Sequence, residues 1–128
     1  MKFLVDTHLL LWAAGEPDLL SQEARSLFTD PDLLFVFSAA SIWEVAIKQT
    51  LGRQDFQADA RQLRRGLLDN GYLELALSSG HAAALPELPR LHKDPFDRIL
   101  IAQANVEGLV LLTSDKQLAA YPGLIRLV

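Results

Sequence analysis

Short apolar runs alternate along the chain with longer helical segments, and these runs predict the strands. Five runs qualify, at residues 3–5, 33–37, 73–77, 109–112 and 124–128. The first two contain no polar alternation, as expected for strands covered on both faces. No repeat, low-complexity tract or linker divides the sequence. The alternation therefore predicts one α/β domain over residues 1–128.

Helix ends can be recognised between these runs from their capping residues. Three helices are predicted in this way: 41–51 with Ser41 as N-cap and Gly52 beyond its end, 58–68 ahead of Asn70-Gly71, and a shorter one after Ser79. The clearest start is Asp94-Pro95, an N-cap followed by proline at the first helical position. It predicts a helix that runs to about Val106, before Gly108.

Composition narrows the classes of protein to consider. A chain of 128 residues, half of them apolar, can bury one core but is too short for two. No apolar run approaches the roughly 20 residues of a membrane-spanning helix, and Asp6 interrupts the N-terminal run too early for a secretory signal. The absence of cysteine excludes thiol catalysis, disulfides and a thiolate zinc site. We therefore expect a soluble protein without membrane contact, and a cytoplasmic location is compatible.

The charge balance argues against a protein that grips nucleic acid by bulk positive charge, since the formal net charge is -4. Nucleic-acid binding would have to rest on local basic groups, which are equally well explained as solvated surface. Two such groups are present: Lys48, Arg53, Arg61, Arg64 and Arg65, and later Arg90, His92, Lys93 and Arg98.

Four acidic residues fall next to the ends of predicted elements although they are far apart in the sequence. Asp6 and Asp115 follow the first and fourth strands, whereas Glu44 and Asp97 lie in the first turns of two predicted helices. In a parallel sheet with crossover helices, the carboxyl ends of strands and the N-termini of the following helices share one edge. We therefore expect the four carboxylates to meet there.

A cluster of this kind implies raised pKa values or a bound cation. Two carboxylates about 4 Å apart repel by about 4 kcal/mol at an effective dielectric constant near 20. All-oxygen ligands favour a hard divalent ion such as Mg²⁺ or Mn²⁺. Such an ion would generate hydroxide from water and stabilise negative charge on a phosphodiester.

Each acid also has a purely structural explanation. Ser41-x-x-Glu44 matches a capping box, in which Glu44 would return a hydrogen bond to the start of the helix. Asp97, three residues after the Asp94 cap, could make a bond of the same kind. Asp6 and Asp115 could be simple N-caps. If all four only cap helices, the chain is a non-catalytic protein-binding module that holds no metal tightly.

A rival enzyme class is a metal-dependent phosphatase or phosphotransferase with Asp6 as the nucleophile. Asp6 has the required place after the first strand of an α/β series. Enzymes of that kind usually carry a second aspartate two residues later, and here this position is His8.

Four short motifs carry a family likeness. They are Val5-Asp6-Thr7-His8 with Leu11-Trp12, Ser38 through Glu44 with Lys48 and Gly52, Leu91-His92-Lys93-Asp94-Pro95-Phe96-Asp97-Arg98 continued by Ile99 to Ala104, and Leu112-Thr113-Ser114-Asp115. Together they resemble the motifs of VapC-type toxins, which are PIN-domain ribonucleases of bacterial toxin-antitoxin pairs. The likeness runs over nearly the whole chain, and the third motif is the most specific.

The resemblance implies a three-layer α/β/α domain around a parallel sheet that cleaves single-stranded or loop RNA with a metal-activated water. It also implies that Asp6 and Asp97 are the principal ligands of Mg²⁺ or Mn²⁺, with Glu44 as the third acid and Asp115 as a fourth that acts through water. We assign Asp94 to helix capping, because the family's acid stands just before the Leu-Ile-Ala stretch.

The resemblance also implies partners, namely a cognate VapB-type antitoxin and a second copy of the chain in a homodimer. Surplus apolar residues in a domain this small are compatible with both interfaces. We expect Trp12 and Trp43 to pack in the core or an interface rather than to stack on bases.

Other polar residues near the motifs have open roles. The hydroxyls of Thr7, Ser38, Thr113 and Ser114 are placed to orient a metal-bound water or to cap strand and helix ends. His8 and His92 flank the motifs and could approach the phosphate. Arg98 could contact RNA or pair with an acid, and we expect His81 to be a surface or capping residue without a role in the site.

Overall fold

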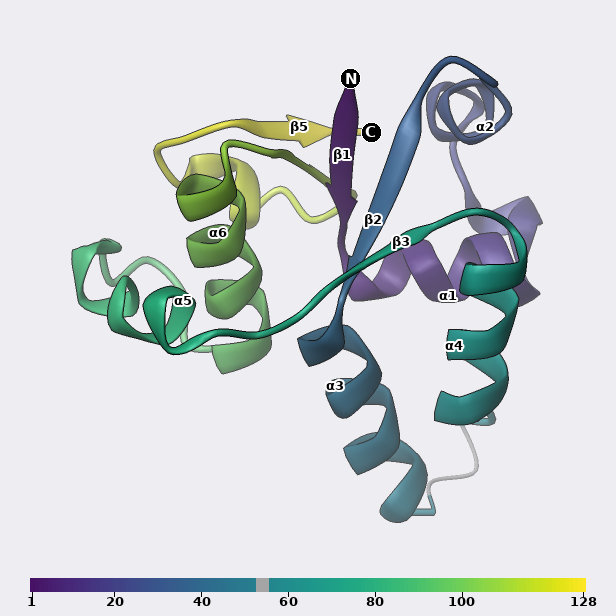
Figure 1. Ribbon diagram of the computed structural model, residues 1–128, viewed down its shortest axis with the longest axis horizontal. Coiled ribbons are helices and arrows are strands. Elements are labelled where there is room, and N and C mark those ends of the chain that lie inside the picture. Colours follow the sequence, from purple (N-terminus) through teal and green to yellow (C-terminus); the bar gives the residue numbers. More distant parts are fainter. Residues whose placement is uncertain (53–55) are drawn as a thin grey trace.

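A parallel sheet runs through the middle of the molecule, with helices on both sides (Figure 1). The computed structural model describes residues 1–52 and 56–128. Neighbouring strands are parallel throughout, in the order β3-β2-β1-β4-β5. The strands are β1 (Lys2–Val5), β2 (Leu34–Ser38), β3 (Leu73–Leu75), β4 (Val110–Thr113) and β5 (Ile125–Leu127).

Helices connect these parallel strands and lie outside the sheet. They are α1 (Thr7–Gly15), α2 (Gln22–Phe28), α3 (Ala39–Thr50), α4 (Ala60–Asp69), α5 (Ser79–Ala83) and α6 (Pro95–Glu107), with 3-10 turns at Pro17–Leu19, Leu85–Glu87 and Leu118–Ala120. Figure 1 shows α1, α2 and α4 on one side of the sheet and α5 and α6 on the other. Among the described residues, no helix is long and apolar enough to cross a membrane.

Alternate side chains of each central strand enter two separate cores, because successive side chains of a strand point to opposite faces. In β1, Phe3 and Val5 join a core completed by α1 and α4, whereas Leu4 joins a core completed by α6. Leu112 and Leu111 of β4 divide in the same way. Both faces of the sheet are therefore buried, and the expected three-layer α/β/α architecture is confirmed.

The five predicted strands are all present, with ends shifted by one or two residues. Four predicted helices are also present, and the best defined is α6. Asp94 caps its first turn, and Gly108 ends it in the left-handed conformation with φ 67°. The helices α1 and α2 were not predicted.

The start of α3 corrects the predicted helix boundary. Ser38 is the N-cap, and its Oγ accepts a hydrogen bond of 3.0 Å from the Ala40 amide. Ser41 lies inside the helix instead, where its hydroxyl accepts from Thr7 Oγ1 at 2.9 Å. Glu44 therefore stands in the second turn of α3, and the capping box suggested by Ser41-x-x-Glu44 does not form.

Candidate active site

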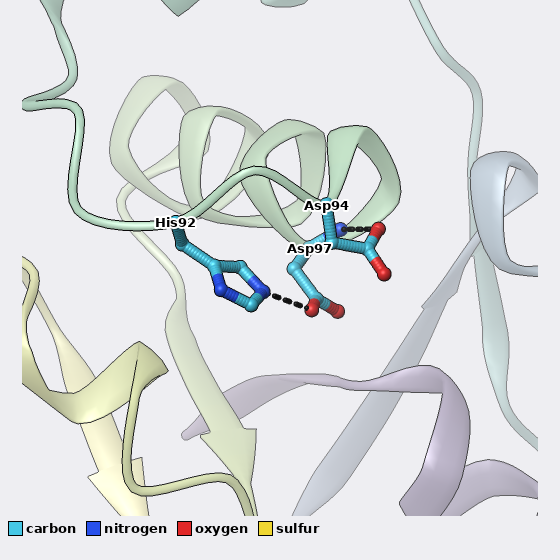
Figure 2. A group of neighbouring side chains, drawn as sticks. All are labelled: His92, Asp94 and Asp97. Carbon is cyan, nitrogen blue, oxygen red and sulfur yellow. Dashed lines mark hydrogen bonds and ion pairs between the residues drawn. The ribbon is translucent and has the colours of Figure 1, made fainter.

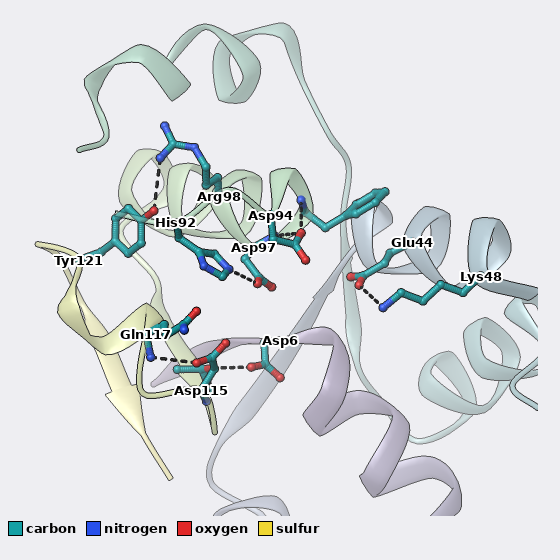
Figure 3. Close-up of polar contacts among 12 residues, drawn as sticks. Asp6, Glu44, Lys48, His92, Asp94, Asp97, Arg98, Asp115, Gln117 and Tyr121 are labelled. Carbon is teal, nitrogen blue, oxygen red and sulfur yellow. Dashed lines mark hydrogen bonds and ion pairs between the residues drawn. The ribbon is translucent and has the colours of Figure 1, made fainter. Parts of the chain in front are cut away.

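The acidic residues gather at the carboxyl edge of the sheet. Asp6 directly follows β1, Asp115 follows β4, and Glu44 and Asp97 project from α3 and α6. Figure 3 shows the four carboxylates around one region, with those of Glu44 and Asp97 facing each other and that of Asp6 beside Asp115. The structure therefore places the four acids at one edge of the sheet, as expected.

Asp6 is buried at the junction of β1 and α1, with only 3% of its surface exposed. Its Oδ1 accepts a hydrogen bond of 2.9 Å from the Leu9 amide, so Asp6 also caps α1. Its Oδ2 accepts a hydrogen bond from the Thr113 hydroxyl. Burial raises the pKa of Asp6 from its ordinary value, although these hydrogen bonds oppose the rise.

Thr113 joins the ends of β1 and β4 through its hydroxyl. Besides donating to Asp6, its Oγ1 accepts from the Asp115 amide at 3.0 Å. Asp115 Oδ1 in turn accepts from the Gln117 amide at 2.8 Å. Of the two open roles of the Thr113 hydroxyl, these contacts support the structural one, because it joins two strand ends and orients Asp6.

Glu44 is the second deeply buried acid of the site, at 3% exposure. Its Oε2 accepts from Lys48 Nζ at 2.8 Å, one turn further along α3. Its Oε1 is buried without a hydrogen-bond partner among residues 1–52 and 56–128. A buried acceptor without a donor costs about 1 to 3 kcal/mol. This oxygen therefore has an unmet need for a donor or a cation.

Asp97 lies in the first turn of α6 and is partly buried. His92 Nε2 is 2.7 Å from its Oδ2, as Figure 2 shows. Burial raises the pKa of Asp97, the contact with His92 lowers it, and the nearby charges of Asp94 and Glu44 raise it further. The charged forms of both Asp6 and Asp97 are therefore disfavoured in the folded protein.

Asp94 caps α6 as predicted, since its Oδ1 accepts from the Phe96 amide at 2.9 Å and from the Asp97 amide at 3.2 Å. It also stands close to the site: one ligand atom each of His92, Asp94 and Asp97 lie within 4.8 Å of one another. Within the described ranges, no other trio of histidine or acidic side chains is so closely spaced. The predicted acids share an edge but are not drawn together that tightly.

Basic residues border this edge on one side. A cavity of about 540 Å³ is lined by Arg90, Leu91, His92, Lys93 and Asp94. Most of the second predicted basic group therefore faces solvent beside Asp97. The first group is dispersed, with Lys48 paired to Glu44 and Arg61, Arg64 and Arg65 exposed on α4. Arg53, assigned to that group, lies outside the described residues.

Arg98 binds backbone carbonyls and a tyrosine in place of the predicted ion pair with an acid, and its other predicted role, contact with RNA, stays a prediction. Its guanidinium donates to the carbonyl oxygens of Pro89 at 2.8 Å and Leu85 at 3.4 Å, and to the Tyr121 hydroxyl at 3.3 Å. It therefore holds the segment before α6 against that helix, and no ion pair of Arg98 with an acid is found in the described part of the chain.

His81 is a capping residue, as one of its two predicted roles required, but it is buried rather than on the surface. Its Nδ1 accepts from the Ser78 amide at 3.0 Å, and its Nε2 is 2.9 Å from Glu107 Oε2. Ser38 donates to Gln103 Oε1 on α6, so this hydroxyl has a structural partner as well.

The two tryptophans differ from each other. Trp12, on α1, is half-buried against the core, as expected. Trp43 is 58% exposed, so it does not pack in the core, and the interface named as its alternative stays a prediction. Its ring meets the ring of Phe96 edge-on, at 5.2 Å between centroids and an interplanar angle of 76°.

The class of protein follows from this arrangement: a three-layer α/β/α domain with acidic side chains gathered at the carboxyl edge of a parallel sheet. The chain belongs to the PIN domain family, whose family model matches residues 3–124. The predicted family is therefore confirmed. Among curated protein sequences, no significant match was found.

Solved structures share this fold. A chain in the structure of VapBC2 from Rickettsia felis bound to a promoter DNA fragment superimposes with a TM-score of 0.71 at 14% identity, over 98% of both chains. A toxin-antitoxin complex from Klebsiella pneumoniae gives 0.63 at 24% identity, over 96% of this chain and 94% of that one. VapBC-1 from nontypeable Haemophilus influenzae gives 0.61 at 17% identity, over 99% and 98%.

Proposed function

We propose that the protein is a VapC-type toxin that cleaves RNA phosphodiesters with the help of a divalent cation. The PIN family assignment and the fold shared with chains of toxin-antitoxin complexes support a nuclease of this type. The observation that carries the metal-dependent chemistry is Glu44 Oε1, which is buried without a hydrogen-bond partner in the described part of the chain. It lies at the edge where Asp6 and Asp97 have raised pKa values.

The residues present fit a hard divalent cation such as Mg²⁺ or Mn²⁺. Carboxylate oxygens are the ligands that these ions prefer, and a cation would offset the cost of ionising Asp6 and Asp97. Asp6, Glu44 and Asp97 would hold it, and Asp115 would act through water. The histidine of the trio His92, Asp94 and Asp97 is less typical of Mg²⁺ than of Mn²⁺.

The reaction would be hydrolysis of one P–O bond of the RNA backbone. When bound, the cation would supply charge neutralisation at the phosphate and lower the pKa of an attacking water. Thr113 would keep the Asp6 carboxylate in one orientation, and His92 would do the same for Asp97. Arg90 and Lys93 beside the site would attract the flanking phosphates.

The alternative of a non-catalytic module whose acids only cap helices explains the contacts poorly. Asp6 and Asp94 do cap helices, but Glu44 and Asp97 do not, because Ser38 and Asp94 occupy those N-caps. A phosphatase mechanism with Asp6 as nucleophile is disfavoured because the second aspartate usual in such enzymes, two residues later, is replaced by His8.

The decisive experiment is cleavage of a structured RNA by the purified protein with Mg²⁺, with Mn²⁺ and with EDTA. We expect cleavage only with a divalent ion, and none by Asp6→Asn under any condition. Cleavage that persists in EDTA would refute the metal dependence. Release of phosphate from a monoester substrate without RNA cleavage would support the phosphatase alternative instead.

A further inference from the structure

Trp43 and Phe96 form an aromatic pair at the rim of the acidic edge. Trp43 immediately precedes Glu44 on α3, and Phe96 immediately precedes Asp97 on α6. Successive helical side chains point about 100° apart. Glu44 therefore turns into the protein, at 3% exposure, while Trp43 turns out beside it, at 58% exposure. An aromatic surface thus stands one residue away from each of two candidate metal ligands.

The contact between the rings holds Trp43 in place despite its exposure. The edge-on geometry, at 5.2 Å and 76°, is a favourable arrangement of two aromatic rings. Because Phe96 is half-buried at the start of α6, it ties the exposed indole to a fixed element. A ring that is already oriented loses little conformational freedom when a ligand stacks on it.

We propose that Trp43, supported by Phe96, is a stacking platform for a base of the RNA next to the cleaved phosphodiester. This inference rests on the proposed function and names a residue that positions its substrate. Single-stranded RNA is held largely by stacking of its bases on aromatic side chains, which tolerates different sequences. A net charge of -4 makes such an uncharged contribution more valuable, since bulk electrostatic attraction is missing.

Ile47 on α3 and Leu51, the C-cap of α3, provide matched controls. They follow Trp43 at spacings of four and eight residues and are 38% and 66% exposed. They therefore share its face of α3 but lie progressively further from Glu44, and they cannot stack on a base. If this face were a protein interface, all three side chains would contribute. If it is a platform for RNA, only Trp43 would.

The test uses Asp6→Asn protein, which is expected not to cleave, and a short single-stranded oligoadenylate RNA. An abasic ribose-phosphate oligomer of the same length is the reference ligand. We expect oligoadenylate to quench tryptophan emission, and Trp43→Ala in this background to weaken its binding about tenfold, as for the loss of one stacked base. Trp43→Phe should keep most of the affinity but lose the quenching, because only Trp12 then emits. Binding of the abasic oligomer should not change.

Three results would overturn the platform: unchanged oligoadenylate affinity in Trp43→Ala, an equal loss for the abasic oligomer, or equal losses in Ile47→Ala and Leu51→Ala. Conversion of a dimer to a monomer by Trp43→Ala, with RNA affinity retained, would assign the face to a protein contact and also overturn it.

The same measurements separate this inference from the proposed function. If the wild-type protein cleaves RNA and Trp43→Ala leaves its KM unchanged, the platform fails alone. If the wild-type protein cleaves nothing while oligoadenylate still binds through Trp43, the proposed function fails, and Trp43 is an RNA-stacking residue without a role in cleavage. In a cleaving enzyme we expect Trp43→Ala to raise KM with little change in kcat.

Discussion

Asp6 combines two roles that make opposite demands on its charge. As the cap of α1 it accepts hydrogen bonds, which favours the carboxylate, but its burial favours the neutral acid and the net effect is a raised pKa. In the folded protein without metal, this residue is therefore under electrostatic strain. A bound cation would relieve it.

The first prediction concerns this strain. Between 3.8, the ordinary pKa of the group, and its raised value, the folded state binds more protons than the unfolded state. The free energy of unfolding of the metal-free protein therefore falls as pH rises through this window, and the cost of charged Asp6 is fully present above it. We expect Asp6→Asn to be more stable than the wild type in EDTA near neutral pH.

Denaturant unfolding in EDTA at several pH values measures this effect. The advantage of Asp6→Asn should shrink as the pH is lowered toward about 4, because the wild-type carboxyl then becomes neutral as well. Added Mg²⁺ should stabilise the wild type more than the variant. A variant that is less stable than the wild type at neutral pH would show that its hydrogen bonds outweigh its burial.

The second prediction separates Asp94 from Asp97. Serine caps helices nearly as well as aspartate, so Asp94→Ser should cost only a few tenths of a kcal/mol and keep metal-dependent cleavage. Asp97→Ser should reduce cleavage below detection while leaving the fold intact by circular dichroism. Equal loss of activity in both variants would make Asp94 a ligand, as its closeness to His92 and Asp97 allows.

At the scale of elements, glycine is favourable at the C-terminal end of α6 and unfavourable in the interior of α4. Gly108 ends α6 with φ 67°, a conformation that costs an L-residue about 1 to 2 kcal/mol. Gly66 lies inside α4, where glycine is about 0.5 to 1 kcal/mol worse than alanine. At neither position does a Cβ added to the glycine meet an atom of the described residues within 4 Å, beyond its own neighbours and helix backbone. Backbone conformation alone should therefore decide the outcome.

The third prediction follows from that contrast. Gly108→Ala should destabilise the protein by about 1 kcal/mol, and Gly66→Ala should stabilise it by about 0.5 kcal/mol or more. Thermal or denaturant unfolding measures both, and metal-dependent activity should change in neither. Two changes of the same sign would contradict the backbone argument.

The sequence predicted the elements whose pattern or ends are distinctive. The apolar runs of the sheet and the Asp94-Pro95 start of α6 are of this kind. The helix α1, with the sequence THLLLWAAG, is apolar on nearly every side, so it shows no helical period to recognise. For α3, both Ser38 and Ser41 are good capping residues, and only the structure shows that β2 ends at the first of them.

The sequence predicted which edge of the sheet holds the acidic residues, but not the hydrogen bonds between their side chains and the rest of the protein. Parallel topology alone brings Asp6, Glu44, Asp97 and Asp115 to one side. The bond between Thr113 and Asp6 joins residues 107 positions apart, and no local pattern encodes it. The pair of Lys48 with Glu44 could have been found, because the two residues are four apart on a helix.

At the scale of the whole molecule, the acidic edge has opposite effects on two kinds of ligand, nucleic acids and basic partner proteins. Without metal, the edge repels phosphate. A basic side chain from a partner could occupy the same place, pair with the acids and exclude the cation. This property makes a cognate VapB-type antitoxin a physically reasonable partner.

The last prediction is that expression of this chain alone in bacteria arrests growth, and that co-expression of a neighbouring small reading frame restores it. Asp6→Asn should be harmless alone yet still copurify with the partner, because it retains the surface that the partner covers. In the partner, replacing the arginine or lysine nearest Asp6 and Glu44 should weaken the complex with the wild type more than with Asp6→Asn, since one of the charges it pairs with is missing there. Growth without arrest, together with the absence of any copurifying chain, would contradict the pairing. Arrest that persists with Asp6→Asn would show that toxicity does not come from the acidic edge.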